Sequence, residues 1–149
     1  MRARRGFALA AVLAALVIMA MVVAVSAQRA LVAARQAGLD VARAELAAAV
    51  STAQVAALDE PVDSARCAEI IPGALLARGE AVAGRALAQW QLVGAAAPFA
   101  TVDVEASVPV FGGTARASHR GLVVPLGDST GSLRWTPVGG LGWTRVPSQ

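Results

Sequence analysis

Residues 7–58 decide the fold: they read FALAAVLAALVIMAMVVAVSA over 7–27 and QRALVAARQAGLDVARAELAAAVSTAQVAAL over 28–58. Neither half contains proline, and strong helix formers, above all alanine and leucine, dominate both. The first half is uncharged, and as a helix its 21 residues span ~32 Å at ~1.5 Å per residue, which matches a hydrocarbon core of ~30 Å. The sequence therefore predicts one nearly continuous helix over 7–58 whose first half is a transmembrane helix.

The second half of this helix, 28–58, is expected to be amphipathic. Apolar side chains recur in it at three- and four-residue steps, which indicates a stripe that packs on another element. Asp40 and Arg43 fall on another face, at a spacing that lets them meet on the helix surface. Pro61 ends the helix near Leu58, because proline disfavours a helical residue before it and supplies no donor. The predicted stripe consists of Leu39, Ala42, Leu46, Ala49, Val50, Ala53 and Ala57.

The composition restricts the class of protein. The chain has 149 residues, of which 56% are hydrophobic and 15% charged, so intrinsic disorder of the whole chain is excluded. The net charge of +3 resides in Arg2, Arg4 and Arg5, because the remaining ten of the thirteen arginines balance ten acidic residues. No basic cluster follows, and we therefore expect no nucleic-acid partner. Three arginines before the apolar run and only Arg29 just after it predict a cytoplasmic N-terminus.

The segment Arg4-Arg5-Gly6-Phe7-Ala8-Leu9, followed directly by the apolar helix, resembles the N-terminus of type IV pilins and type II secretion pseudopilins. The resemblance implies that a prepilin peptidase cuts after Gly6 and methylates Phe7, so that 1–6 is a leader peptide. It further implies a single-pass inner-membrane anchor, a periplasmic or extracellular head, and packing against other pilin or pseudopilin subunits through the helix. The span would be carried by Phe7, Leu9, Val12, Leu13, Leu16, Val17, Ile18, Val22, Val23 and Val25.

One residue departs from the pattern of the major pilins. These carry a glutamate at the fifth mature position, where this chain has Ala11. In the family that carboxylate is thought to meet the terminal amine of a neighbouring subunit. Minor pilins and K-type minor pseudopilins also lack it, although this chain does not have the large helical insertion of the best-known K-type proteins. The resemblance therefore implies an accessory, low-copy subunit.

Two alternatives explain the same N-terminal residues. A secretory signal peptide cleaved after Ala27 would release a small periplasmic or secreted β-domain that acts as a binding module, since Val25-Ser26-Ala27 fits signal peptidase. Against it, the apolar run is longer than the ~7–15 residues of an ordinary h-region, and the helical pattern continues through the cut. The third option is an uncleaved membrane anchor that keeps Met1.

Strand signals follow a linker and irregular segment predicted over 59–87. Residues 101–108 alternate strictly, with Val102 and Val104 on one face and Asp103 and Glu105 on the other. Glycine-rich turns separate the strands, the first at 112–113. The sequence predicts an α+β fold in which an antiparallel meander over 88–149 covers the apolar stripe of the helix. The expected strands are 88–93, 101–108, 114–124, 132–136 and 143–146, with the last two paired so that Trp135 and Trp143 could meet.

The motifs of catalysis and metal binding are incomplete. Residues 127–131 match G-x-S-x-G, but the only histidine, His119, precedes them and they lie between two predicted antiparallel strands, so we interpret them as a turn. His119 falls on the inward parity of its strand and is expected to be a partly buried structural residue. The single cysteine, Cys67, forms no internal disulfide and is expected to be a small buried residue. We predict no cofactor, no metal and no enzymatic activity.

Overall fold

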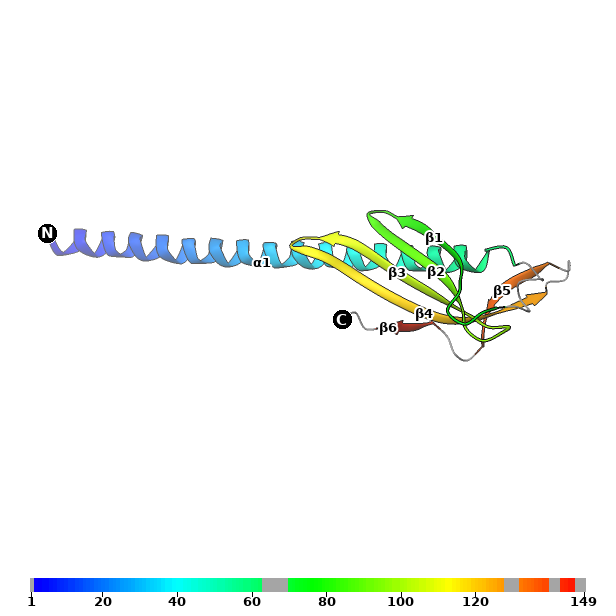
Figure 1. Cartoon of the computed structure of the whole chain (residues 1–149). Coiled ribbons are helices and arrows are strands. Elements are labelled where there is room, and N and C mark those ends of the chain that lie inside the picture. The colour runs from blue at the N-terminus through cyan, green and yellow to red at the C-terminus, as the bar shows by residue number, and fades with distance from the viewer. Residues whose placement is uncertain (1, 63–69, 128–131, 140–142, 147–149) are drawn as a thin grey trace. The chain divides into compact units, whose positions relative to one another are not determined.

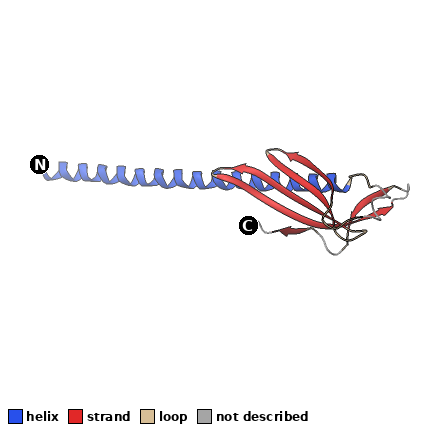
Figure 2. Ribbon diagram, in the orientation of Figure 1, coloured by secondary structure: helices blue, strands red, loops and turns tan. Residues whose placement is uncertain are grey.

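The computed structural model describes residues 2–62, 70–127, 132–139 and 143–146, with side chains in the helix from Ala10 onward. One helix, α1 (Arg2–Leu58), precedes an antiparallel sheet, so the fold is α+β as predicted. Figures 1 and 2 show this order along the chain. The strands are β1 (Leu75–Ala83), β2 (Ala86–Gly94), β3 (Ala100–Val110), β4 (Gly113–Gly127), β5 (Leu133–Pro137) and β6 (Thr144–Val146).

The chain divides into two compact units. The first contains residues 1–39, all within the N-terminal part of α1 in the described range, and the second contains 40–149. The second unit holds the rest of α1 together with the whole sheet, and we call it the head. All tertiary packing discussed below lies within the head.

Helix α1 runs through Ala27 and Gln28 without a break and ends at Leu58, where the sequence predicts its end. The Asp59 amide donates the last helical hydrogen bond, to the Val55 carbonyl at 2.9 Å. Leu39 differs from the prediction, because it is 45% exposed and belongs to the first unit. The other members of the predicted stripe are buried: Ala42, Leu46, Ala49, Val50, Ala53 and Ala57.

The sheet is a meander from β1 to β5, in which every strand pairs antiparallel with the next. Its inner face buries alternate residues of the two central strands, and the buried stripe of α1 joins them in a single core. The predicted alternation of 101–108 is confirmed, since Val102 and Val104 are fully buried while Asp103 and Glu105 face the opposite side. The strands supply to the core Ala81, Ala86, Ala88, Trp90, Leu92, Ala100, Val102, Val104, Ala106, Val108, Val123 and Trp135.

A strand, β1, lies in the segment 59–87 where the sequence predicts a linker and irregular structure. Two glycines, Gly79 and Gly84, interrupt the helix-forming residues of this segment, and both have specific places in the β1–β2 hairpin. Gly84, with φ of +59°, lies in the tight turn between β1 and β2. Gly79 pairs with Trp90 of β2 and leaves room for the indole ring. The sheet therefore begins at Leu75 rather than at residue 88.

The last strand pairs differently from the prediction. β5 and β6 both pair with β4 and not with each other, because β4 is 15 residues long and accommodates β5 along 123–127 and β6 along 118–120. Trp135 is buried in β5. Trp143 instead lies against Gly121 of β4, where a Cβ would come within 2.7 Å of its ring. The predicted terminal hairpin, across which the two tryptophans could meet, is therefore wrong.

Candidate functional site

The N-terminal part of α1 is exposed and apolar. An 18-residue window in the helix from Ala10 onward has a mean hydropathy of 2.7, and no part of that window is buried within the chain. Such a helix is long and apolar enough to cross a membrane. Eight of the predicted span residues have described side chains, and all are exposed by 48% or more: Val12, Leu13, Leu16, Val17, Ile18, Val22, Val23 and Val25.

The residues of the predicted processing site lie at the start of the same helix. Gly6, Phe7 and Leu9 fall within α1, and their side chains lie outside the described set. Ala11, which stands where major pilins have a glutamate, is exposed on α1. Ser26, next to the alternative cleavage point, donates from its Oγ to the Val22 carbonyl at 2.6 Å, which satisfies its hydroxyl within the helix.

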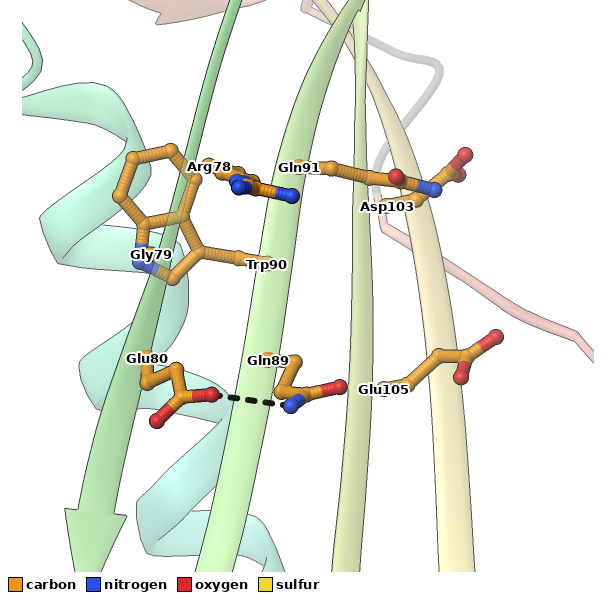
Figure 3. A pocket seen from close by; sticks show the side chains of 8 residues that line it. All are labelled: Arg78, Gly79, Glu80, Gln89, Trp90, Gln91, Asp103 and Glu105. Atoms are coloured by element: carbon orange, nitrogen blue, oxygen red, sulfur yellow. Dashed lines mark hydrogen bonds between the residues drawn. The ribbon is translucent and has the colours of Figure 1, made fainter.

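The outer face of the sheet is polar and holds a shallow pocket of about 510 Å³. Figure 3 shows the side chains that line it. The pairing register aligns two rows across three strands, one beginning with Arg78 on β1 and one beginning with Glu80. In the second row, Gln89 Nε2 donates to Glu80 Oε1 at 2.9 Å. The rows are Arg78, Gln91 and Asp103, and Glu80, Gln89 and Glu105.

Asp103 connects this pocket to β4. Arg120, its cross-strand partner, donates to the carboxylate through Nε and Nη2, the latter at 3.0 Å from Oδ2. The hydrogen bond to Asp103 and then its negative charge raise the pKa of the Arg120 guanidinium. Thr144 Oγ1 of β6 donates to the Arg120 carbonyl at 3.1 Å. The ion pair therefore joins β3 to β4, and the Thr144 hydrogen bond joins β6 to the backbone of β4.

The inner side of the head holds a second pocket, of about 570 Å³, between α1 and β4. Leu46 and Val50 of the buried stripe line it together with His119 and Trp143, which are half-buried. His119 thus has the partly buried, inward position predicted from its strand parity. This pocket is lined mainly by apolar and aromatic groups, unlike the pocket on the outer face.

The remaining candidates for chemistry show no assembled site. Among the described side chains, no three His, Cys, Asp or Glu groups come together in a way that could hold a metal ion. Cys67 lies outside the described residues, and so do positions 128–131 of the G-x-S-x-G match. Gly127 ends β4 and the next described strand, β5, is antiparallel to it. The described strands before and after that segment are therefore antiparallel to each other, whereas a nucleophile elbow lies between a strand and a helix.

The chain matches no protein-family model, and comparisons with curated proteins and with solved structures find no match. The long apolar helix followed by an antiparallel sheet is compatible with a pilin-like fold. The class that the structure itself defines is a protein with one membrane-competent N-terminal helix and an α+β head.

Sequence reasoning missed two features of the head surface. One is the exposure of Phe111, whose side chain is 93% exposed in the turn before Gly112 and Gly113. A large aromatic residue directly before a glycine pair is a signal that could have been noticed, because turns are formed mostly by small and polar residues. The other is the pocket between α1 and β4, which depends on Trp143 lying over Gly121 and had no sequence signal.

Proposed function

We propose that this protein is a pilin-like accessory subunit of a type IV pilus or a type II secretion pseudopilus. It is anchored in the inner membrane by the first half of α1, with a cytoplasmic N-terminus and a periplasmic or extracellular head. Prepilin peptidase processes it after Gly6, and the helix packs in the bilayer and against other pilin or pseudopilin subunits. The protein works as a structural subunit, not as an enzyme.

A single observation carries this proposal: the exposed apolar half of α1 is covalently continuous with a half that is packed in the head. Burial of a valine or leucine side chain is worth about 1.5–3 kcal/mol. The many exposed apolar side chains between Val12 and Val25 therefore make an aqueous environment strongly unfavourable. A bilayer removes this cost, and a helix satisfies its own backbone hydrogen bonds there.

The accessory role rests on Ala11. In a filament whose shaft subunits carry a glutamate at this position, a neighbouring terminal amine would lack its partner at this subunit. A buried charge that loses its partner costs several kcal/mol. The protein is therefore a poor repeating unit, and we expect it in low copy number. If it were the dominant component of purified filaments, the accessory role would be wrong.

Intact mass spectrometry of the full-length protein tests the proposal, after expression in a host that contains prepilin peptidase. The proposal requires a chain that begins at N-methylated Phe7. A chain beginning at Gln28 would establish the signal-peptide alternative, and a chain retaining Met1 would establish a simple anchor. Either result overturns the proposal.

A matched pair of variants makes the mass measurement specific. Gly6→Val should prevent processing, because the resemblance requires the small residue before the cut. Gly38→Val is its control, since a Cβ at position 38 meets no atom within 4 Å. We expect an unprocessed chain for the first variant and normal processing for the second. Equal processing of both would contradict cleavage at Gly6.

A further inference from the structure

β1 forms one border of the sheet (Figure 1), and we call its side that faces away from β2 the β1 border. Within the described residues β1 pairs with β2 and with no other strand, and it is nine residues long without proline or lysine. The opposite border is divided between β5 and β6, which have five and three residues, and Pro137 ends β5. Short strands and proline protect a sheet edge from pairing with another chain. The β1 border has neither of these protections.

The register of the β1–β2 hairpin determines which backbone groups of β1 face this border. Gly84, with φ of +59°, lies in the two-residue turn between the paired Ala83 and Ala86. Such a turn closes on a hydrogen-bonded pair, and hydrogen-bonded pairs alternate with non-bonded pairs along an antiparallel ladder. Every second residue of β1 therefore directs its amide and carbonyl groups away from β2. These residues are Arg78, Glu80 and Val82.

The side chains of the same three residues are exposed and have bonding capacity to spare. Val82 is 66% exposed beside its cross-strand partner Leu87, which is 38% exposed. Glu80 uses Oε1 to accept the hydrogen bond from Gln89 (Figure 3). Arg78 has no ion-pair partner among the described side chains. From the turn onward, the β1 border thus presents an apolar, an acidic and a basic residue in that order.

We propose that the β1 border binds an extended segment of a different protein as an added antiparallel strand. The segment carries an apolar, a basic and an acidic residue at alternate positions, opposite Val82, Glu80 and Arg78 in turn. Its main chain pairs with the free amide and carbonyl groups of these three residues, which supplies affinity, and its alternate side chains supply specificity. The antiparallel direction is favoured because antiparallel pairing is slightly more stable per residue than parallel pairing.

A second copy of β1 fits this border less well than such a segment. Two copies place Arg78 opposite Glu80 only when they pair about Gly79. In that register Val82 falls opposite Leu76, which has no partner on β2 because the register shifts there, and which packs against the core. Only two of the three open residues would then have a regular partner. The occupant that matches all three is therefore a different chain.

A labelled peptide, fluorescein-Thr-Val-Thr-Lys-Thr-Glu-Thr-amide, tests the main-chain pairing by fluorescence anisotropy with the purified full-length protein in detergent micelles. Antiparallel to β1, its valine, lysine and glutamate lie opposite Val82, Glu80 and Arg78. N-methylation of the lysine removes a donor that faces the border and should weaken binding about tenfold or more. N-methylation of the threonine after it alters an amide that faces away, and should leave the affinity within about twofold. Equal losses from both modifications, or no saturable binding of the unmodified peptide, would overturn the proposal.

An exchange of charges tests the order of the side chains. Arg78→Glu combined with Glu80→Arg should lower the affinity for this peptide about tenfold, and a peptide with its lysine and glutamate exchanged should restore it. The matched control is Glu105→Arg with Arg116→Glu, which exchanges charges at exposed positions of β3 and β4 away from the border. An equal loss in the control, or no restoration by the exchanged peptide, contradicts the proposed pairing.

Sedimentation of the full-length protein in the same micelles tests the other occupant. We expect its oligomeric state to stay the same when the peptide is added. A dimer that the peptide dissociates would assign the β1 border to a second copy and overturn the proposal.

This inference concerns the head alone and goes beyond the subunit role proposed above. A chain that begins at Gln28 in the mass measurement would contradict the membrane anchor but not strand addition at β1. Failure of the peptide to bind would contradict strand addition but not the processing at Gly6.

Discussion

The indole ring of Trp90 lies across the backbone of Gly79, its cross-strand partner, so closely that a Cβ at position 79 would come within 2.6 Å of ring atom Cζ2. Trp90 is only 6% exposed, and its ring belongs to the core that the sheet shares with α1. Glycine at position 79 is therefore required for the packing of the β1–β2 hairpin. Figure 3 shows the ring beside the glycine.

Gly79→Ala should destabilise the head, because overpacking of a well-packed core costs about 1–3 kcal/mol. Denaturant unfolding of the purified full-length protein, followed by tryptophan fluorescence, measures the change. Gly113→Ala is the matched control in another strand, since its added Cβ meets nothing within 4 Å. Equal midpoints for the two variants would show that the Trp90 ring moves aside without cost.

Glu45 attaches the β1–β2 turn to α1. Arg85 donates to its carboxylate through Nη2 at 3.0 Å and through Nε at 3.2 Å and 3.3 Å. The Glu45 side chain is 21% exposed and that of Arg85 is 57% exposed, so water screens the pair in part. Exposed ion pairs contribute about 0.2–1 kcal/mol, and the bidentate geometry places this one toward the upper end.

A double-mutant cycle with Glu45→Gln and Arg85→Gln should therefore give a coupling free energy of about 0.5–1 kcal/mol that falls as salt is added. The control cycle uses Asp40→Asn and Arg43→Gln. That pair is joined at 3.1 Å, but its side chains are 71% and 77% exposed, and we expect a coupling near zero. Equal coupling in the two cycles would contradict a specific role for Glu45.

Leu92 is the largest side chain that is fully buried in the sheet, with 1% exposure. Leu92→Ala should cost about 2–5 kcal/mol, because it removes buried methyl groups and leaves a cavity in the core. Leu126→Ala, at a position with 52% exposure, should change the free energy of unfolding by less than about 0.5 kcal/mol. Comparable losses from both would mean that the inner face of the sheet is not the core.

The helix α1 and the strand at 101–108 could be predicted from the sequence because each has a periodic pattern of apolar residues that are close together in the chain. Between Ala42 and Ala57 the residues at the predicted three- and four-residue steps are buried, and within 101–108 every second residue is buried, as predicted. The short range of these patterns also explains the failure at β1. Gly79 and Gly84 look like helix and strand breakers until Trp90 and Glu45, which are distant in sequence, occupy the space above them.

The pairing of β6 and the pocket beside it depend on relationships that no local pattern contains. Nothing in the sequence around Trp143 indicates that β6 pairs with 118–120 of β4 and not with β5. The ring of Trp143 lies so close to Gly121 that a Cβ at position 121 would come within 2.7 Å of it, and this contact joins residues that are distant in sequence. The pocket could therefore be found only in three dimensions.

The membrane anchor gives the last prediction. Val17 and Met21 lie near the middle of the apolar span, one helical turn apart, and are 52% and 63% exposed. An arginine at the centre of a transmembrane helix costs about 2.5–3.5 kcal/mol for insertion. Val17→Arg combined with Met21→Arg should therefore move most of the protein out of the carbonate-resistant membrane fraction.

The matched control is Ala44→Arg with Ala48→Arg, which has the same spacing on the exposed face of α1 within the head and should leave fractionation unchanged. Retention of the first variant in the membrane at the level of the second would mean that the apolar half of α1 does not anchor the protein, and the subunit function proposed for it would fail.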